Sequence, residues 1–180
     1  MKLGEEQLDL DDIDRHILRL MQENCRLPLA KIGDQVGLSP PAVLERVKKL
    51  EDSGVIMGYR AVLNARLVGK DVTAFIGVSI GHPKAIGRFE KEMEALDDVL
   101  ECHHVTGSHT LLLKVKTQNT SSLEELISRV RSIEGVVRTE TMVVLSTHTE
   151  RAQLALNGAP LRAAKRGRRN GVHGDRAAIH

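Results

Sequence analysis

The sequence predicts an α+β protein in which an N-terminal winged helix-turn-helix domain precedes a ferredoxin-like βαββαβ domain. Two observations lead to this prediction. Residues 28–54 have the pattern of two short helices joined by a tight turn. Residues 72–150 alternate β-branched, strand-like segments with two amphipathic helical segments. We therefore expect a helix-turn-helix domain at 8–60, a linker at 61–71, a ferredoxin-like domain at 72–150 and a basic, mostly flexible tail at 151–180.

The helix-turn-helix prediction rests on residues that begin and end helices as well as on the apolar periodicity. Apolar residues recur at helical spacing in 29–36, and Gly37 can take the positive φ that ends a helix. Ser39 offers a hydroxyl to cap a second helix, and Pro40 suits the first position of that helix. Gly54 closes the helix. Its predicted buried stripe consists of Val43, Leu44, Val47 and Leu50.

The opposite face of the second helix has the chemistry of a DNA-recognition helix. Small residues near its start permit close approach to a groove, and Arg or Lys side chains reach base edges or phosphates. The candidate DNA-binding residues are Ser39, Pro41, Ala42, Glu45, Arg46, Lys48 and Lys49. The alternative is an ordinary helical hairpin with a solvated charged face.

Flanking segments complete the first domain. Residues 11–23 predict a helix with acids in its first turn, capped by Asp11 or Asp12, that packs behind the helix-turn-helix. Residues 55–63 suggest two short strands that form a small wing or a link to the second domain.

The second domain has the order β-α-β-β-α-β, typical of a sheet with two helices on one face. The expected strands are 72–80, 99–106, 109–116 and 136–147, and the expected helices are 84–96 and a segment from Ser121 or Ser122 to Gly135. Val143, Val144 and Leu145 are consecutive apolar residues in the last strand. We infer that a partner subunit covers the second face of this sheet.

Composition narrows the class of protein. Charged residues make up 28% and hydrophobic residues 41%, which is typical of a soluble globular chain, and no apolar run is long enough to span a membrane. The first residues do not resemble a secretory signal, and two cysteines, Cys25 and Cys102, suit a reducing cytoplasm. Residues 151–180 carry a formal charge of +6 and the remainder −4. The tail either adds sequence-independent phosphate contacts or is a passive extension.

The sequence gives little support for an enzyme or for a metal-binding protein. The sequence shows no acid pair, no nucleophile with a base and no glycine-rich phosphate loop, so we expect no catalysis. Cys102, His103, His104 and His109 lie close in sequence, but their spacing matches no zinc motif, so we expect neither a metal nor another cofactor.

Several motifs in order resemble one family of prokaryotic transcription factors, the Lrp/AsnC (leucine-responsive/asparagine-synthase regulator) family. The motifs are DDIDRHIL at 11–18, VGLSP at 36–40, LERVKKLE at 44–51, GVIMGY at 54–59, ECH at 101–103 and VTG at 105–107. The resemblance covers residues 8–150 and implies sequence-specific binding to double-stranded DNA. It also implies dimers that assemble into tetramers or octamers, and control of amino-acid metabolism genes by a small amino-acid effector at a subunit interface.

The resemblance also places the effector. Gly107 matches the glycine of the family's effector loop, and Thr139 and Thr141 match hydroxyl positions of the last strand. The implied effector-binding residues are Gly107, Ser108, His109, Thr110, Thr139 and Thr141. Family members often carry acids after that glycine, whereas this loop is neutral, so Glu101 and Glu140 are the alternative partners for an α-ammonium group. A second functional class is an architectural, nucleoid-type DNA-binding protein that has lost its effector.

Overall fold

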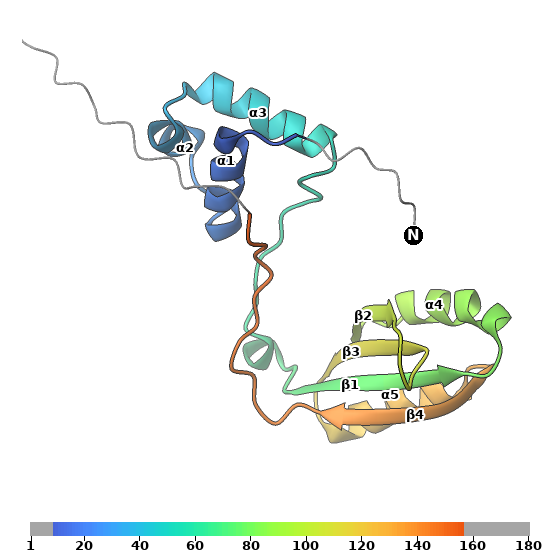
Figure 1. The fold of residues 1–180 in the computed structure, drawn as a ribbon. Helices are drawn as coiled ribbons and strands as arrows, with labels where there is room; N and C mark the ends of the chain where they lie inside the picture. Colours follow the sequence, from blue (N-terminus) through green and yellow to red (C-terminus); the bar gives the residue numbers. More distant parts are fainter. Residues whose placement is uncertain (1–8, 157–180) are drawn as a thin grey trace, which may run out of the picture. The chain divides into compact units, whose positions relative to one another are not determined.

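The computed structural model describes residues 9–156 and divides the chain into two compact units (Figure 1). One unit contains the N-terminal residues up to Arg60 together with the C-terminal residues from Arg151, and the other is Ala61–Glu150. Residues 151–156 contain no helix or strand. The rest of the tail lies outside the described residues, as does the prediction that it is flexible.

The first unit begins with helix α1, Asp12–Glu23. Asp11 caps it as predicted: its carboxylate accepts a hydrogen bond from the backbone N–H of Asp14 at 2.7 Å, and the Asp14 carboxylate accepts from the backbone N–H of Asp11 at 3.4 Å. This reciprocal capping box satisfies backbone donors that a helix start leaves free. Ile17 and Leu18 are the buried residues of α1.

Helices α2, Leu29–Val36, and α3, Pro40–Asp52, form the predicted helix-turn-helix. Gly37 ends α2 in the left-handed region with φ 74°, so the turn uses the conformational freedom expected of this glycine. The three helices share one core, whose buried members are Ile17, Leu18, Ile32, Val36, Val43, Val47 and Leu50.

The expected wing is not formed. Residues 55–63 contain no strand, and the first regular element after α3 is a short 3₁₀ helix, Ala65–Val68. A strand needs a hydrogen-bonded neighbour, and this segment is instead tied to the helical core: Ile56 packs against it, and the Tyr59 hydroxyl donates to the Glu51 carboxylate at 2.7 Å. Met57 and Val62 are exposed.

The second unit confirms the predicted ferredoxin-like arrangement. Its strands are β1 (Val72–Ile80), β2 (Val99–His104), β3 (Leu111–Thr117) and β4 (Val136–Val143). Its helices are α4 (Ile86–Glu94), preceded by a 3₁₀ turn at Pro83–Ala85, and α5 (Thr120–Ser132). The sheet is antiparallel with the order β2-β3-β1-β4, which puts β1 and β3 in its centre.

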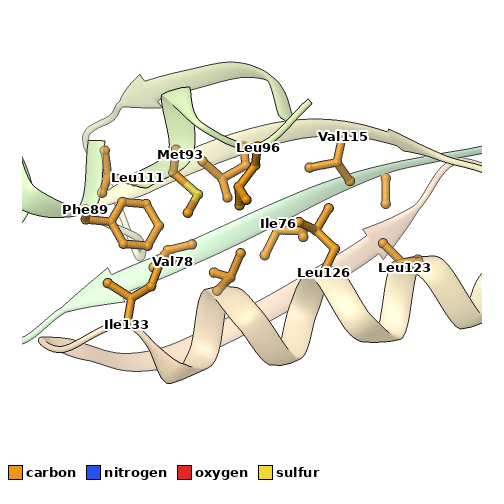
Figure 2. Packing of buried hydrophobic residues seen from close by; sticks show 13 residues of the cluster. Ile76, Val78, Phe89, Met93, Leu96, Leu111, Val115, Leu123, Leu126 and Ile133 are labelled. Carbon is orange, nitrogen blue, oxygen red and sulfur yellow. The ribbon is translucent and has the colours of Figure 1, made fainter. Parts of the chain in front are cut away.

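The two helices cover one face of the sheet. Figure 2 shows Phe89 and Met93 of α4 and Leu126 of α5 against Ile76 of β1 and Leu111 of β3. Residues that are paired across neighbouring strands share a face, and the register pairs Ile76 with Leu113 and Thr141. These residues therefore lie on the helix-covered side.

The other side of the sheet has no helix over it in the described part of the chain. The register pairs Gly77 with Leu112 and Glu140, and Phe75 with Lys114 and Met142. We call the face formed by these six residues the open face. No helix among residues 9–156 is long and apolar enough to cross a membrane.

Candidate DNA-binding and effector sites

Ser39, at the start of α3, is exposed and its hydroxyl does not cap the helix. Ser39 occupies the N-cap position as predicted, but its side chain makes no capping hydrogen bond, which corrects the expectation that its hydroxyl caps the helix. Pro40 stands at the first turn, where its missing N–H costs no hydrogen bond. The exposed Ser39 hydroxyl therefore remains available to a ligand at the helix N-terminus.

Most predicted DNA-binding residues lie together on the exposed side of α3, opposite buried Val43, Val47 and Leu50. This group consists of Pro41, Glu45, Lys48 and Lys49, which are exposed, and Ala42, which is half-buried. Lys48 and Lys49 lie in the second half of the helix, where cations also complement the helix dipole.

Leu44 corrects the sequence prediction. The pattern places it in the buried stripe, but 55% of its surface is exposed, next to Glu45. A helix turns by about 100° per residue, so Leu44 lies at the edge of the stripe that begins at Val43, and the helices of residues 9–156 leave that edge uncovered. An exposed leucine on this side of α3 adds an apolar group that sequence reasoning missed.

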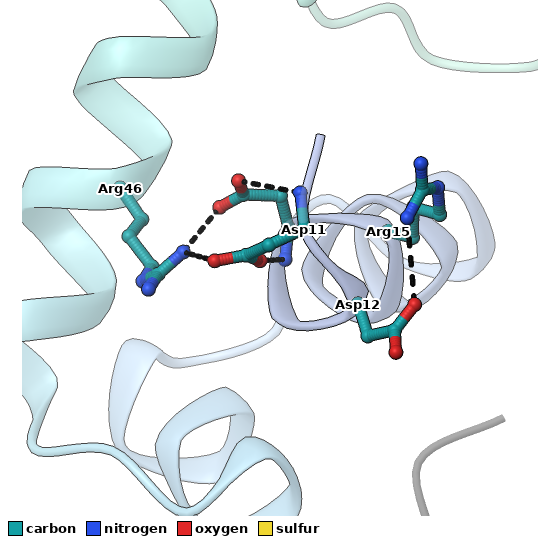
Figure 3. A network of polar contacts seen from close by, with 5 residues as sticks. Asp11, Asp12, Arg15 and Arg46 are labelled. Atoms are coloured by element: carbon teal, nitrogen blue, oxygen red, sulfur yellow. Dashed lines mark hydrogen bonds and ion pairs between the residues drawn. The ribbon is translucent and has the colours of Figure 1, made fainter. Parts of the chain in front are cut away.

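Arg46 has a position different from the other predicted residues. Its Nη1 donates to Asp11 Oδ2 and to Asp14 Oδ1, each at 2.7 Å, so it connects α3 to the start of α1 (Figure 3). The Asp14 side chain is only 14% exposed and that of Arg46 is 32% exposed. This pair of charge-assisted hydrogen bonds braces the helix bundle.

We call the contacts of Arg46 with Asp11 and Asp14 the Arg46 brace. These contacts shift the pKa values of Asp11 and Arg46. Partial burial opposes ionisation of Asp11, but the backbone N–H of Asp14 and the Arg46 guanidinium outweigh it and lower the pKa of Asp11. The hydrogen bonds to Asp11 and Asp14 raise the pKa of Arg46.

In the second unit, the predicted effector loop connects β2 to β3. Gly107 has φ 121°, a conformation that side-chain-bearing residues rarely adopt, and Gly107 and Ser108 are exposed. Thr110 attaches the loop to the end of β1. Its backbone N–H donates to the Val78 carbonyl at 2.9 Å, and its Oγ1 accepts from the Ile80 N–H at 3.1 Å.

His109 turns back from this loop onto the open face. Its ring lies so close to Gly77 that a Cβ added there would be 2.5 Å from His109 Cδ2. His109 Nε2 is 3.7 Å from Glu140 Oε2, and buried Nδ1 has no hydrogen-bond partner in the described part of the chain. The structure therefore brings Glu140, but not Glu101, beside the loop histidine.

Glu101 is engaged elsewhere. Its carboxylate contacts His103 Nε2 at 3.0 Å and Lys114 Nζ at 3.2 Å, and the hydrogen bond to His103, followed by that to Lys114, lowers the pKa of Glu101. Lys114 also donates to the Glu150 carboxylate at 2.8 Å, and this bond lowers the pKa of Glu150.

The six predicted effector residues do not form one pocket within the chain. Thr139 and Thr141 pair with Val78 and Ile76, so they share the helix-covered side, whereas the His109 ring lies over Gly77 on the open face. Thr139 lines a shallow hollow of about 320 Å³ with Arg131, Val136, Val137 and Arg138. The two groups of residues can act on one ligand only if subunits contribute them from different sides.

The cysteine and histidine cluster is also separated. Cys102 pairs with Leu113 and packs against the core, and this burial raises the pKa of its thiol. His103, next along β2, pairs with Leu112 of the open face. Within residues 9–156, no three His, Cys, Asp or Glu side chains are grouped to hold a metal ion.

A helix-turn-helix whose second helix exposes Lys48 and Lys49, joined to a ferredoxin-like domain, is typical of a DNA-binding regulator with a separate second domain. Family models agree on both halves: an AsnC-type helix-turn-helix domain matches residues 10–51, and an Lrp/AsnC ligand binding domain matches residues 73–154. The chain belongs to the Lrp/AsnC family of transcriptional regulators and is not an enzyme.

Relatives match over nearly their whole length. An HTH-type transcriptional regulator of Pyrococcus abyssi is 32% identical over 83% of this chain and 99% of its own. The structure of a Neisseria meningitidis transcriptional regulator in complex with L-Met has a TM-score of 0.80 and 32% identity, covering 83% of this chain and 98% of that one. A feast or famine regulatory protein from M. tuberculosis complexed with L-methionine has a TM-score of 0.76 and 32% identity, covering 81% and 99%.

Proposed function

We propose that this regulator reads operator DNA with the exposed side of α3 and controls amino-acid metabolism genes in response to an amino acid bound at a subunit interface. The observation that carries the DNA-binding part is the division of α3 into a buried side and an exposed side. Val43, Val47 and Leu50 hold the helix from behind, which leaves Lys48 and Lys49 free to enter a major groove.

The contacts differ along α3. The Ser39 hydroxyl suits a phosphate, and Pro41 and Ala42 let the helix start approach the DNA closely. Glu45 suits the amino group of cytosine, and Lys49 suits base edges or phosphates. Leu44 adds an apolar contact of the kind that thymine methyl groups provide.

Arg46 serves this interface indirectly. Two carboxylates already hold its guanidinium, so a DNA contact would require it to leave Asp11 and Asp14. The sequence pattern had indicated that Arg46 contacts DNA. We instead assign it to positioning α3.

We further propose that the open face is covered by a second copy of the chain, from which larger assemblies are built. Phe75 and Leu112 are half-buried there, and Met142 is 46% exposed. Beyond the end of β4, Leu145 is 93% exposed. Apolar residues that one chain leaves exposed on a sheet face are buried at low cost against a symmetric partner.

The effector proposal combines the loop with Glu140. Backbone donors around Gly107 and the Ser108 hydroxyl suit a carboxylate, and the Glu140 carboxylate supplies the negative charge that the loop lacks. Two relatives were solved with L-methionine, so this amino acid is the first candidate. Thr139 and Thr141 would contribute hydroxyls from another subunit.

Such a ligand changes DNA binding only if it prefers one assembly over another. Titration calorimetry with L-methionine and then the other amino acids tests binding, and light scattering of the same samples tests assembly. We expect at least one binder of modest affinity that shifts the assembly equilibrium.

Gly107→Asp should abolish binding, because its backbone conformation is strained for any side chain and the new carboxylate repels that of the ligand. Gly87→Asp is the matched control, since this glycine of α4 faces open space and has no positive φ. If no amino acid binds, the architectural function replaces this one. If one binds while assembly and DNA affinity stay unchanged, the switching mechanism is wrong.

A further inference from the structure

The open face has a gap at Gly77, in the middle of its central strand β1. Gly77 pairs with Leu112 of β3 on one side and with Glu140 of β4 on the other, so these three positions form one row across the face. Leu112 and Glu140 each present a side chain there, and Gly77 presents none. A glycine inside a strand often marks a place where another group comes close to the backbone.

The imidazole ring of His109 fills this gap. A Cβ added to Gly77 would lie 2.5 Å from Cδ2 of the ring and 2.7 Å from both Cγ and Nε2, so the flat side of the ring, rather than one edge, lies against the glycine. The His109 side chain is only 16% exposed. His109 therefore supplies the side chain that the open face lacks at Gly77, although it belongs to the loop between β2 and β3.

The ring is held there by packing rather than by hydrogen bonds. Its Nδ1 is buried and has no hydrogen-bond partner among residues 9–156, and its Nε2 lies 3.7 Å from Glu140 Oε2, which is beyond hydrogen-bond distance. The base of the loop, in contrast, is fixed, because the Val105 N–H donates to the Thr110 carbonyl at 3.1 Å. The ring can therefore leave Gly77 while the ends of the loop stay in place.

The same loop carries the proposed effector site. Gly107 and Ser108, whose backbone and hydroxyl donors suit a carboxylate, directly precede His109 and are exposed. Glu140, the proposed partner of the ligand's ammonium group, is also the carboxylate that lies 3.7 Å from the ring. An amino acid that binds these groups therefore changes the surroundings of the ring from two sides.

We propose that His109 couples the effector to pairing of the open faces: its ring completes the surface that the second copy contacts, and a bound amino acid moves the ring off Gly77. The inference rests on the proposed function and assigns its regulation to one side chain. In a two-fold symmetric pair each copy contributes one ring, so the interface loses two contacts when both rings move. The ligand then prefers the unpaired open face, which is the differential affinity that such a switch requires.

The experiment measures the pairing equilibrium of the full-length chain by sedimentation, with and without L-methionine, and the affinity for L-methionine by calorimetry. His109→Ala removes the ring. The double variant His109→Ala/Gly77→Ala also places a methyl group in the gap. His104→Ala is the matched control, because this exposed histidine of β2 pairs with Leu111 on the helix-covered side. Melting curves establish that each variant is folded.

Without ligand, His109→Ala should pair about tenfold more weakly than the parent, the effect expected when a central interface residue is truncated. It should still bind L-methionine, but the ligand should no longer change its pairing. The double variant should pair more tightly than His109→Ala, because the methyl group fills part of the gap, and it should be equally unresponsive. Saturating L-methionine should weaken pairing of the parent and of His104→Ala by the same factor.

Parental pairing of ligand-free His109→Ala would mean that the ring is not part of the interface and would overturn the proposal. A parental response of this variant to L-methionine would also overturn it, because another residue would then couple the ligand to pairing. In both cases the parent still binds L-methionine. A parent that binds no amino acid contradicts the proposed effector function itself, and with it the coupling, so the two failures are distinguishable.

Discussion

The two units of the chain differ in how they complete their folds. In the described residues, the helix-turn-helix core has seven buried members, and the core of the second unit has thirteen. The small core is supplemented by polar contacts at its edge. These are the hydrogen bonds of Arg46 to Asp11 and Asp14, and the hydrogen bond from the backbone N–H of Leu154 to the Gln22 side chain in α1. The larger core is complete on one side of its sheet and leaves the open face without a helix.

This difference shows how one chain separates two tasks. The first unit can expose charged residues of α3 because Val43, Val47 and Leu50 bury the other side of this helix and the ion pairs of Arg46 connect it to α1. The second unit leaves apolar groups such as Met142 exposed on the open face, where we propose that a second copy of the chain binds. Substitutions that disturb one unit at a time test this contrast.

The largest effect is expected from Met142→Glu on the open face. A carboxylate buried there without a partner would cost about 3 to 5 kcal/mol and prevent pairing of two copies. Val137→Glu is the control, because Val137 lies near the opposite end of β4 and is 71% exposed. Light scattering should show a smaller assembly for the first variant only. A parental assembly for Met142→Glu would mean that the open face is not the interface.

A smaller effect is expected where His109 covers Gly77. Gly77→Ala places a methyl group into the imidazole ring, and such overpacking costs about 1 to 3 kcal/mol. The cost should largely disappear in a His109→Ala background, since the ring is then absent. Gly87→Ala, at a glycine that faces open space, should not destabilise the protein. Denaturant unfolding of the four variants measures the coupling, and simple additivity would contradict the contact.

In the first unit, Arg46→Ala should lower the free energy of unfolding by about 1 kcal/mol, because Asp11 and largely buried Asp14 lose the hydrogen-bond donor that they share. Arg15→Ala is the matched control, since it removes only a 3.4 Å pair with exposed Asp12 on the same helix (Figure 3). Loss of DNA affinity by Arg46→Ala should be no larger than this loss of stability explains. A large affinity loss without destabilisation would return Arg46 to the group of base-reading residues.

The smallest effect concerns pH. The pKa of Asp11 is lowered in the folded state, so its ionised form stabilises the helix bundle above its unfolded pKa of about 3.9. This contribution disappears as the pH falls through the lower folded pKa. Asp11→Asn should therefore be less stable than the parent by a few tenths of a kcal/mol at neutral pH, and equally stable in strong acid. Melting curves at several pH values measure the gap, and a gap independent of pH would contradict the brace.

The sequence was sufficient for elements whose pattern is local. β1 follows from its β-branched run, α2 and α3 follow from Gly37 and Pro40, and Asp11 marks the start of α1. The order of strands then follows from the ferredoxin-like sequence of elements. Most of the exposed face of α3 was also predictable, since its charged residues fall outside the stripe of Val43, Val47 and Leu50.

The errors and omissions involve contacts between distant residues. Leu44 has the right residue type for the core, but only the packed bundle shows that its edge is left uncovered. Residues 55–63 are apolar enough for strands, but no neighbour pairs with them in the described part of the chain. Arg46 meets Asp11 across 35 positions of the chain, and His109 meets Gly77 from a loop. No periodic pattern carries such information.

DNA affinity of Lys49→Ala tests most directly the claim that the exposed side of α3 reads the operator. Lys49 is exposed on that side, and Lys91→Ala removes the same charge from exposed Lys91 of α4. Fluorescence anisotropy should show that Lys49→Ala binds operator DNA more weakly by about 1 to 3 kcal/mol, with parental stability and assembly, whereas Lys91→Ala binds like the parent. Parental affinity for Lys49→Ala, or an equal loss for both variants, would contradict the account.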